Sequence, residues 1–138
     1  MDKRPLQRRA KVLVVDDDKQ IGQLIKAALK EFKTETLQSR AELLQRLKRE
    51  PVDALLLDWR LEDGDGIVLI DAIRDAWPGT SIILMTGYGT DEVIIRAIKR
   101  GAFHFLAKPF DAAALRQTVR RAIDNTRISQ AGRAARKN

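Results

Sequence analysis

The chain has 138 residues, enough for one domain with a buried core but too few for two ordinary domains. Hydrophobic residues make up 44% and charged residues 33%, which is typical of soluble globular proteins and excludes a disordered or fibrous chain. The net charge of +7 is confined to the ends, because residues 1–10 carry +3 and residues 126–138 carry +4. Residues 11–125 are therefore neutral overall, with no excess charge that would steer them to nucleic acid.

Several kinds of segment and chemistry are absent from the sequence. No apolar run approaches the roughly 20 residues that cross a bilayer, so we expect no membrane association. The basic start of the chain is not followed by an apolar segment, so it lacks the pattern of a secretory signal. The absence of cysteine excludes disulfides, thiolate metal sites and cysteine catalysis, and it is compatible with a cytoplasmic location.

Strand and helix patterns alternate along the chain. In chain order, strands are predicted at 12–15, 34–37, 54–57, 82–85 and 104–107. Helices are predicted at about 19–32, after Ser39, at about 66–76, at about 91–100 and after Asp111. The first, third and fourth strands are apolar at every position, which is typical of parallel strands covered on both faces. Together these elements predict an α/β fold with a doubly wound parallel sheet.

Residues with helix-end preferences mark several of these boundaries. Ser39 and Glu42 form a capping-box pattern at the start of the second helix. Asp18 and Asp111 are expected to be the N-caps of the first and last helices. Gly101 is expected to end the fourth helix, because glycine readily adopts the backbone conformation that follows a helix.

Two basic segments flank the predicted domain, which we place at residues 11–125. Residues 1–10 are interpreted as a basic N-terminal extension. Residues 126–138 mix Gly, Ser, Gln and Arg and are interpreted as a basic tail, either a frayed helix or a linker. Either segment could also be a basic end that binds other molecules through its charge.

Polar residues stand at the carboxyl ends of four predicted strands. They are Asp16, Asp17 and Asp18 after the first strand, Asp58 after the third, Thr86 after the fourth and Lys108 after the fifth. In an open parallel sheet, ligands bind beyond the carboxyl ends of the strands. If the first strand is central, these side chains converge on one edge of the sheet.

The chemistry of these residues is complementary. Clustered carboxylates repel one another unless a cation joins them, and hard oxygen ligands favour Mg²⁺, which also binds phosphate oxygens. A carboxylate such as Asp58 can attack phosphorus and form an acyl phosphate. Lys108 would add positive charge, and Thr86 a hydroxyl donor, for the phosphoryl oxygens. Taken singly, each residue also has an ordinary interpretation, as a turn former, a helix cap, a strand end or a surface lysine.

Four segments carry a more specific signal, in the order VLVVDDD, ALLLDWRLEDGDG, ILMTGYG and GAFHFLAKPF. With them the sequence resembles the receiver domains of two-component response regulators, over about 11–123. The last two segments are similar to those of the nitrogen-regulator and redox-regulator classes. The resemblance implies five helices around a five-stranded parallel sheet of flavodoxin-like order 2-1-3-4-5. It also implies a signalling domain that is phosphorylated by a sensor histidine kinase or a phosphotransfer protein, rather than an enzyme.

The resemblance implies a role for each residue at the carboxylate edge. Asp58 matches the phosphoacceptor, which dephosphorylates slowly by its own chemistry. Asp16 and Asp17 match the acidic pair that holds Mg²⁺, for which Mn²⁺ can substitute. Asp58 and the backbone carbonyl of Arg60 are expected to be further ligands of this ion. Lys108 matches the lysine that contacts the phosphoryl group.

The resemblance also implies a switch. The peptide bond between Lys108 and Pro109 is expected to be cis. Thr86 and Phe105 match the pair that moves together on phosphorylation, when the new charge draws the threonine inward and the aromatic ring turns into the vacated space. This movement would change the face formed by the fourth helix, the fifth strand and the last helix, and so control an output partner or a homodimer.

The fourth helix is apolar over an arc of about 200°. Its apolar residues are Val93, Ile94, Ile95, Ala97 and Ile98. Either this helix is deeply packed, or part of its apolar surface is exposed to a partner. His104, the single histidine of the sequence, falls within the fifth strand and is interpreted as structural rather than catalytic.

Other classes of protein share parts of this pattern. Phosphatases of the haloacid dehalogenase type use an aspartate nucleophile, but in a D-x-D motif at the first strand followed by Thr or Val, whereas Asp18 here precedes Lys19. A flavodoxin-like ligand binder needs a phosphate-binding glycine loop after the first strand, and this sequence has none there. An interaction module, a domain that only binds other proteins, would not explain why four separate segments carry polar residues to the same edge of the sheet. No helix-turn-helix or ATPase motif is present, so nucleic acid is expected to be contacted only through an output domain outside this sequence.

Overall fold

The computed structural model describes residues 9–87 and 91–137. Its main sheet has five parallel strands, namely β1 (Lys11–Val15), β2 (Lys33–Leu37), β3 (Ala54–Asp58), β6 (Ser81–Thr86) and β7 (His104–Ala107). The helices are α1 (Lys19–Ala28), α2 (Arg40–Arg46), α3 (Leu69–Ala76), α4 (Asp91–Lys99) and α5 (Ala112–Lys137). The strand order β2-β1-β3-β6-β7 confirms the predicted order 2-1-3-4-5, counted over these five strands.

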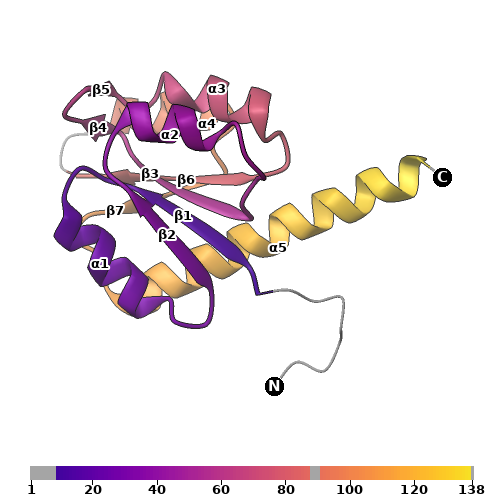
Figure 1. Ribbon diagram of the computed structural model, residues 1–138, viewed down its shortest axis with the longest axis horizontal. Coiled ribbons are helices and arrows are strands. Elements are labelled where there is room, and N and C mark those ends of the chain that lie inside the picture. The colour runs from indigo at the N-terminus through magenta and orange to yellow at the C-terminus, as the bar shows by residue number, and fades with distance from the viewer. Residues whose placement is uncertain (1–8, 88–90, 138) are drawn as a thin grey trace.

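Helices cover both faces of the sheet, as Figure 1 shows. The helices α2, α3 and α4 lie over one face, and α1 and α5 lie over the other (Figure 1). The central strand β3 is buried at every residue, and its side chains alternate between two clusters. Leu55 and Leu57 point into the first cluster, and Ala54 and Leu56 into the second. This two-sided burial explains why the strand is apolar throughout instead of alternating.

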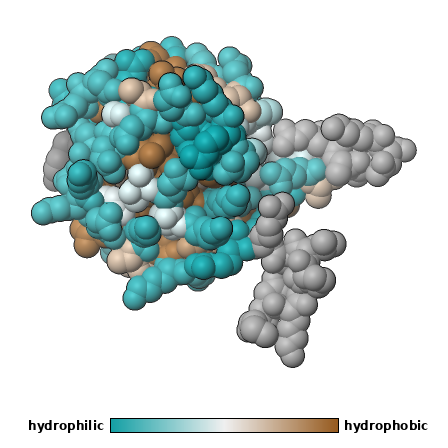
Figure 2. All heavy atoms as spheres, viewed as in Figure 1, coloured by the Kyte–Doolittle hydropathy of each residue, from teal (hydrophilic) through white to brown (hydrophobic). Residues whose placement is uncertain are grey.

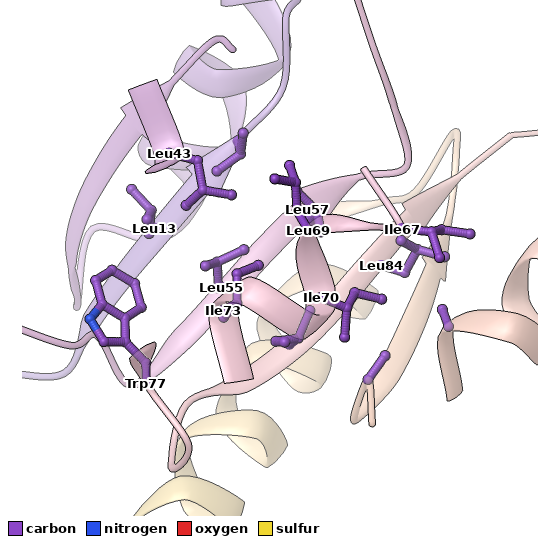
Figure 3. Close-up of a cluster of buried hydrophobic side chains, with 14 of the residues drawn as sticks. Leu13, Leu43, Leu55, Leu57, Ile67, Leu69, Ile70, Ile73, Trp77 and Leu84 are labelled. Atoms are coloured by element: carbon purple, nitrogen blue, oxygen red, sulfur yellow. The ribbon is translucent and has the colours of Figure 1, made fainter. Parts of the chain in front are cut away.

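The first cluster packs the sheet against α2 and α3 (Figure 3). Leu13 of β1 and Leu43 of α2 meet Leu55 there, and Ile70 and Ile73 of α3 complete the contact. Each of these side chains is fully buried, which stabilises the fold by about 1.5–3 kcal/mol per residue. The outer surface is different, since the face in Figure 2 is largely hydrophilic with scattered apolar side chains.

The predicted helix caps are present. The Asp18 side chain accepts a hydrogen bond from the Gln20 N–H at 2.9 Å. The Ser39 hydroxyl accepts from the Glu42 N–H at 3.1 Å, while the Glu42 carboxylate accepts from the backbone of the residue before Ser39. Asp111 accepts from the backbone N–H three residues on at 2.7 Å. Gly101 follows α4 with φ of +108°, a conformation that favours glycine.

The first helix ends earlier than predicted, at Ala28 rather than at about residue 32. The apolar pattern continues to Phe32, but the backbone N–H of Lys33 must pair with the carbonyl of Ala10 to begin β2. The turn exposes carbonyl groups at Lys30 and Phe32, and both accept hydrogen bonds from the Arg9 guanidinium. Tertiary pairing therefore overrides the local helical pattern.

A short antiparallel hairpin, β4 (Arg60–Leu61) and β5 (Gly64–Asp65), follows β3 and was not predicted. It delays the start of α3 from the predicted residue 66 to Leu69. The Asp65 carboxylate accepts from the Ile67 N–H at 2.8 Å and leads the chain from the hairpin into that helix.

The last helix continues where a frayed helix or linker was predicted from residue 126. Helix α5 is continuous to Lys137 and projects beyond the sheet (Figure 1). Thr126 is fully buried, and its hydroxyl lies 2.6 Å from the Asp53 carbonyl oxygen and 2.7 Å from the Ser81 hydroxyl. The helix is thereby attached to the sheet at the point where the tail was expected to begin. Within residues 9–87 and 91–137, no helix is long and apolar enough to cross a membrane.

Candidate functional site

Three carboxylates meet at the carboxyl edge of the sheet. Strands β1 and β3 are neighbours, with Val15 opposite Leu57, so the residues that follow Val15 lie beside Asp58. Asp16, Asp17 and Asp58 each offer an oxygen atom, and these atoms all lie within 4.8 Å of one another. Asp16 and Asp58 are buried, at 2% and 8% exposure. The parallel sheet therefore brings together three acids from two segments more than 40 residues apart in the sequence.

Lys108 joins this cluster from β7, at the far side of β6. Its ammonium donates a hydrogen bond to Asp16 Oδ2 at 2.7 Å and lies 3.4 Å from Asp58 Oδ2. The backbone N–H of Lys108 donates to the Thr86 carbonyl, which extends the ladder between β6 and β7. The peptide bond between Lys108 and Pro109 is cis. One ammonium thus contacts two of the three carboxylates.

The close approach of these charges shifts their protonation. Burial, and after it the charge of the neighbouring Asp16, raise the pKa of Asp58 to about 6 against the opposing effect of Lys108. Burial alone would lower the pKa of Lys108, but its hydrogen bond to Asp16 and the charge of Asp58 outweigh this, so the pKa is raised. The ammonium therefore stays charged, and it does not fully offset the repulsion between the two buried carboxylates.

The donor set fits a hard divalent cation. All three side chains offer carboxylate oxygens, the ligands that such a cation prefers, and two of the three residues are buried. Arg60 lies next to Asp58, since its backbone N–H donates to Asp58 Oδ1 at 3.2 Å. Its guanidinium stacks on the Trp59 ring, 5.5 Å from the centroid. The Arg60 carbonyl as a metal ligand stays a prediction.

Thr86 has a buried hydroxyl on the strand next to Asp58. Asp58 pairs with Met85 of β6, so Thr86 is one residue further along the neighbouring strand. Thr86 is 1% exposed, and within the described part of the chain its hydroxyl has no hydrogen-bond partner. A buried hydroxyl without a partner is costly.

Phe105 lies outside the carboxylate cluster. It pairs with Leu84, two residues before Thr86, so the Thr86 and Phe105 side chains project from the same face of the sheet. Phe105 is 37% exposed, which places its ring at the surface. The remaining ring residue of this strand, His104, pairs with Ile83 away from the carboxylate edge, and its Nδ1 accepts from the Phe105 N–H at 2.8 Å.

Two further residues shape the site, and their structural roles were not predicted from the sequence. A side chain at Gly66 would collide with the backbone carbonyl of Asp58, because the Gly66 N–H donates to the Trp59 carbonyl at 2.7 Å and holds the two segments together. Asp63 stands at the turn of the unpredicted hairpin. The signal for both is the repeated Asp-Gly pair in the segment 63–66, a composition typical of tight hairpin turns.

Comparison with known proteins agrees with this geometry. The family model of the response regulator receiver domain matches residues 12–120. The response regulator protein PilR of Pseudomonas aeruginosa is 40% identical over 117 residues, 83% of this chain. The acid tolerance regulatory protein ActR of Rhizobium meliloti is 38% identical over 103 residues, 73% of this chain. The chain spans 26% of PilR and 53% of ActR.

Solved structures of receiver domains have the same fold as this chain. The receiver domain of NtrX from Brucella abortus superposes with a TM-score of 0.77 at 31% identity, and the match covers 82% of this chain and 98% of that one. The beryllofluoride-activated receiver domain dimer of NtrC4 has a TM-score of 0.79 at 33% identity, and the match covers 84% of this chain and 98% of that one.

Proposed function

Because this chain belongs to the family of response regulator receiver domains, we propose that Asp58 accepts a phosphoryl group from a phosphohistidine of a sensor histidine kinase or a phosphotransfer protein. One observation carries this proposal: the buried Asp58 carboxylate lies within reach of both a second buried carboxylate and the Lys108 ammonium. A carboxylate in these surroundings is a nucleophile with a cation already in place beside it.

The chemistry follows from the groups at this edge. An Asp58 oxygen forms a bond to phosphorus, the bond between phosphorus and the histidine nitrogen breaks, and its electron pair stays on the imidazole. Lys108 is positioned to offset negative charge on the transferred group, since it already contacts Asp58. Asp16, Asp17, Asp58 and the Arg60 carbonyl would hold Mg²⁺, or Mn²⁺ in its place. When bound, the ion supplies further positive charge to the phosphoryl oxygens.

We assign the switch to Thr86 and Phe105. The Thr86 hydroxyl is buried without a partner among the described residues, and a phosphoryl oxygen on Asp58 would give it one. Movement of Thr86 toward Asp58 would open space on the face of the sheet that it shares with Phe105, whose ring is now at the surface. The phosphorylated state would then differ in the surface formed by α4, β7 and α5.

This surface would control an output partner or a homodimer. Ile95 and Ile98 of α4 are 54% and 45% exposed, which favours the interpretation that α4 presents apolar surface to a partner. In α4 only Ala97 is fully buried. The NtrC4 receiver, a dimer when activated by beryllofluoride, supports a second copy of this chain as the occupant. The proposal includes a cytoplasmic location and a transcriptional output of the nitrogen-regulator type, as the relation to NtrX-like regulators suggests.

The proposal is tested by phosphorylation with acetyl phosphate and Mg²⁺, followed by intact-protein mass spectrometry. The wild-type protein should gain one phosphoryl group, and EDTA or the substitution Asp58→Asn should abolish the gain. Asp18→Asn is the matched control, because Asp18 only caps α1 and asparagine caps a helix equally well. Modification of Asp58→Asn would refute Asp58 as the acceptor. Repeated turnover of small phosphate esters would indicate a phosphatase, and no modification at all would indicate an interaction module.

A further inference from the structure

The tip of the β4–β5 hairpin is attached to the start of helix α2. The Asp63 carboxylate accepts hydrogen bonds from two backbone N–H groups of that helix, Arg40 at 3.0 Å and Ala41 at 3.3 Å. In return, the Arg40 guanidinium donates to the Asp63 carbonyl at 3.2 Å. These three hydrogen bonds join segments 22 and 23 residues apart in the sequence.

The helix does not depend on Asp63 as its sole cap. The first N–H groups of any helix lack partners within the helix. In α2 the Ser39 hydroxyl already accepts from the Glu42 N–H, and Asp63 accepts from the two N–H groups that precede it. The hydrogen bond from the Arg40 N–H lowers the pKa of Asp63, so the carboxylate remains ionised. The hairpin is therefore held by a charged group on a helix N-terminus.

The hairpin also sits directly beside the acceptor. Its first residue, Arg60, donates its N–H to Asp58 Oδ1, and its last residue, Asp65, pairs with Arg60. Leu61 is buried in the core below. The hairpin is thus fixed at its base by Leu61 and by the Gly66 N–H, and at its tip by Asp63.

The tip of the hairpin packs closely against the Arg40 side chain of α2. Gly64 has φ of +142°, a conformation that other residues rarely adopt. The Arg40 side chain packs against its Cα, so that any side chain at Gly64 would collide with the guanidinium. Rotation of the tip on α2 would break the two hydrogen bonds that the Asp63 carboxylate accepts.

We infer that Asp63 is a positioning residue for the phosphoacceptor site. By holding the tip of the hairpin on α2, it would set the direction of the Arg60 backbone, and with it the carbonyl proposed as a metal ligand and the N–H that donates to the Asp58 carboxylate. The inference rests on the proposed function in one respect, namely that a divalent cation binds at this edge. Residues that orient metal ligands from outside the coordination sphere typically change metal affinity when they are removed.

The decisive measurement is Mg²⁺ binding to the metal-free protein by isothermal titration calorimetry. Asp63→Ala should weaken Mg²⁺ binding by about 10-fold, and Asp63→Asn, which keeps one acceptor oxygen, by less. Ser39→Ala is the matched control, because it removes a cap of the same helix without touching the hairpin. Both alanine variants should lower the melting temperature, but Ser39→Ala should bind Mg²⁺ like the wild-type protein.

Amide hydrogen exchange without metal gives an independent readout. In Asp63→Ala, the N–H groups of Arg60 and Gly66 should exchange faster than in the wild-type protein, whereas in Ser39→Ala they should not. Unchanged Mg²⁺ affinity in Asp63→Ala, or equal loss in Ser39→Ala, would overturn the inference and leave the proposed function intact. If the wild-type protein did not bind Mg²⁺, both the inference and the proposed function would be overturned. In that case Asp58 should also remain unmodified in the phosphorylation experiment.

Discussion

Thr86 and Thr126 are both buried, but their hydroxyl groups have different surroundings. The Thr126 oxygen accepts from the Ser81 N–H at 3.1 Å and lies 2.6 Å from the Asp53 carbonyl oxygen. Among the described residues, the Thr86 hydroxyl has no partner at all. A buried polar group that is unpaired in one state and paired in another biases the equilibrium toward the second state. The unpaired Thr86 hydroxyl would therefore contribute to the free-energy difference between the unphosphorylated and the phosphorylated states of the proposed switch.

Replacing each threonine with the nearly isosteric valine separates these two situations. Thr86→Val should raise the free energy of unfolding by about 1 kcal/mol, because it removes an unsatisfied hydroxyl. Thr126→Val should lower it by about 1–3 kcal/mol, because it removes the buried hydroxyl that hydrogen-bonds with both the Ser81 N–H and the Asp53 carbonyl. Chemical denaturation of both variants without metal measures the two changes. Destabilisation of Thr86→Val by as much as Thr126→Val would show that the Thr86 hydroxyl is satisfied in the resting protein.

At the scale of elements, the segment from β3 to α3 decides the shape of the site. Strand β3 ends on Asp58, the β4–β5 hairpin follows at once, and the chain returns at Gly66 to hydrogen-bond with Trp59. The return is possible because Gly66 has no side chain to meet the Asp58 carbonyl. Close approach of two backbone segments, rather than an unusual φ angle, is the reason for glycine here.

Alanine at two glycines tests this requirement. Gly66→Ala should lower the free energy of unfolding by about 2–3 kcal/mol, because the added methyl group forces the hairpin away from Asp58. Gly22→Ala in α1 is the control, since its added methyl group would meet Thr36 at an ordinary 3.4 Å. Alanine favours the helix, so Gly22→Ala should raise that free energy by about 0.5–1 kcal/mol. The two variants are compared by denaturation, and equal stability of Gly66→Ala and the wild-type protein would contradict the proposed packing.

At the scale of the whole molecule, apolar side chains at the surface occur on distinct faces. Ile95 and Ile98 of α4 and Phe105 of β7 lie on the surface that we propose for association, and Leu24 of α1 is 67% exposed on the opposite face of the sheet. The face shown in Figure 2 is largely hydrophilic, with scattered apolar side chains. A partner that covers one face therefore leaves the other accessible.

The proposed homodimer can be tested with one charge on each face. Ile98→Glu should weaken self-association of the protein activated with beryllofluoride and Mg²⁺ by about 10-fold or more, since a charge in an apolar contact costs at least about 1.4 kcal/mol. Leu24→Glu should associate like the wild-type protein. Sedimentation velocity over a range of concentrations measures both. The dimer face is wrong if Ile98→Glu associates as strongly as the wild-type protein, or if Leu24→Glu loses association instead.

The sequence by itself determined the parts of this protein that local patterns encode. Fully apolar runs such as 54–57 predict strands covered on both faces, and capping residues such as Asp18 and Ser39 predict where helices begin. Parallel strands carry their carboxyl ends to one edge, so Asp16, Asp58 and Lys108 could be expected to meet once the strands were identified. These features depend on neighbours in the chain or on strand direction alone.

Tertiary structure decided everything that depends on contacts between distant segments. Pairing of Lys33 with Ala10 ends α1 early, and the buried Thr126 hydroxyl lets α5 continue past the expected boundary although the segment contains Gly and Ser. Exposure of Ile95 on α4 was left open by its periodicity, because an apolar arc does not say how much of it a neighbour covers. The contact of Asp63 with α2 has no local signature, since both hydrogen bonds reach the backbone of another element, and only the folded chain brings them within range.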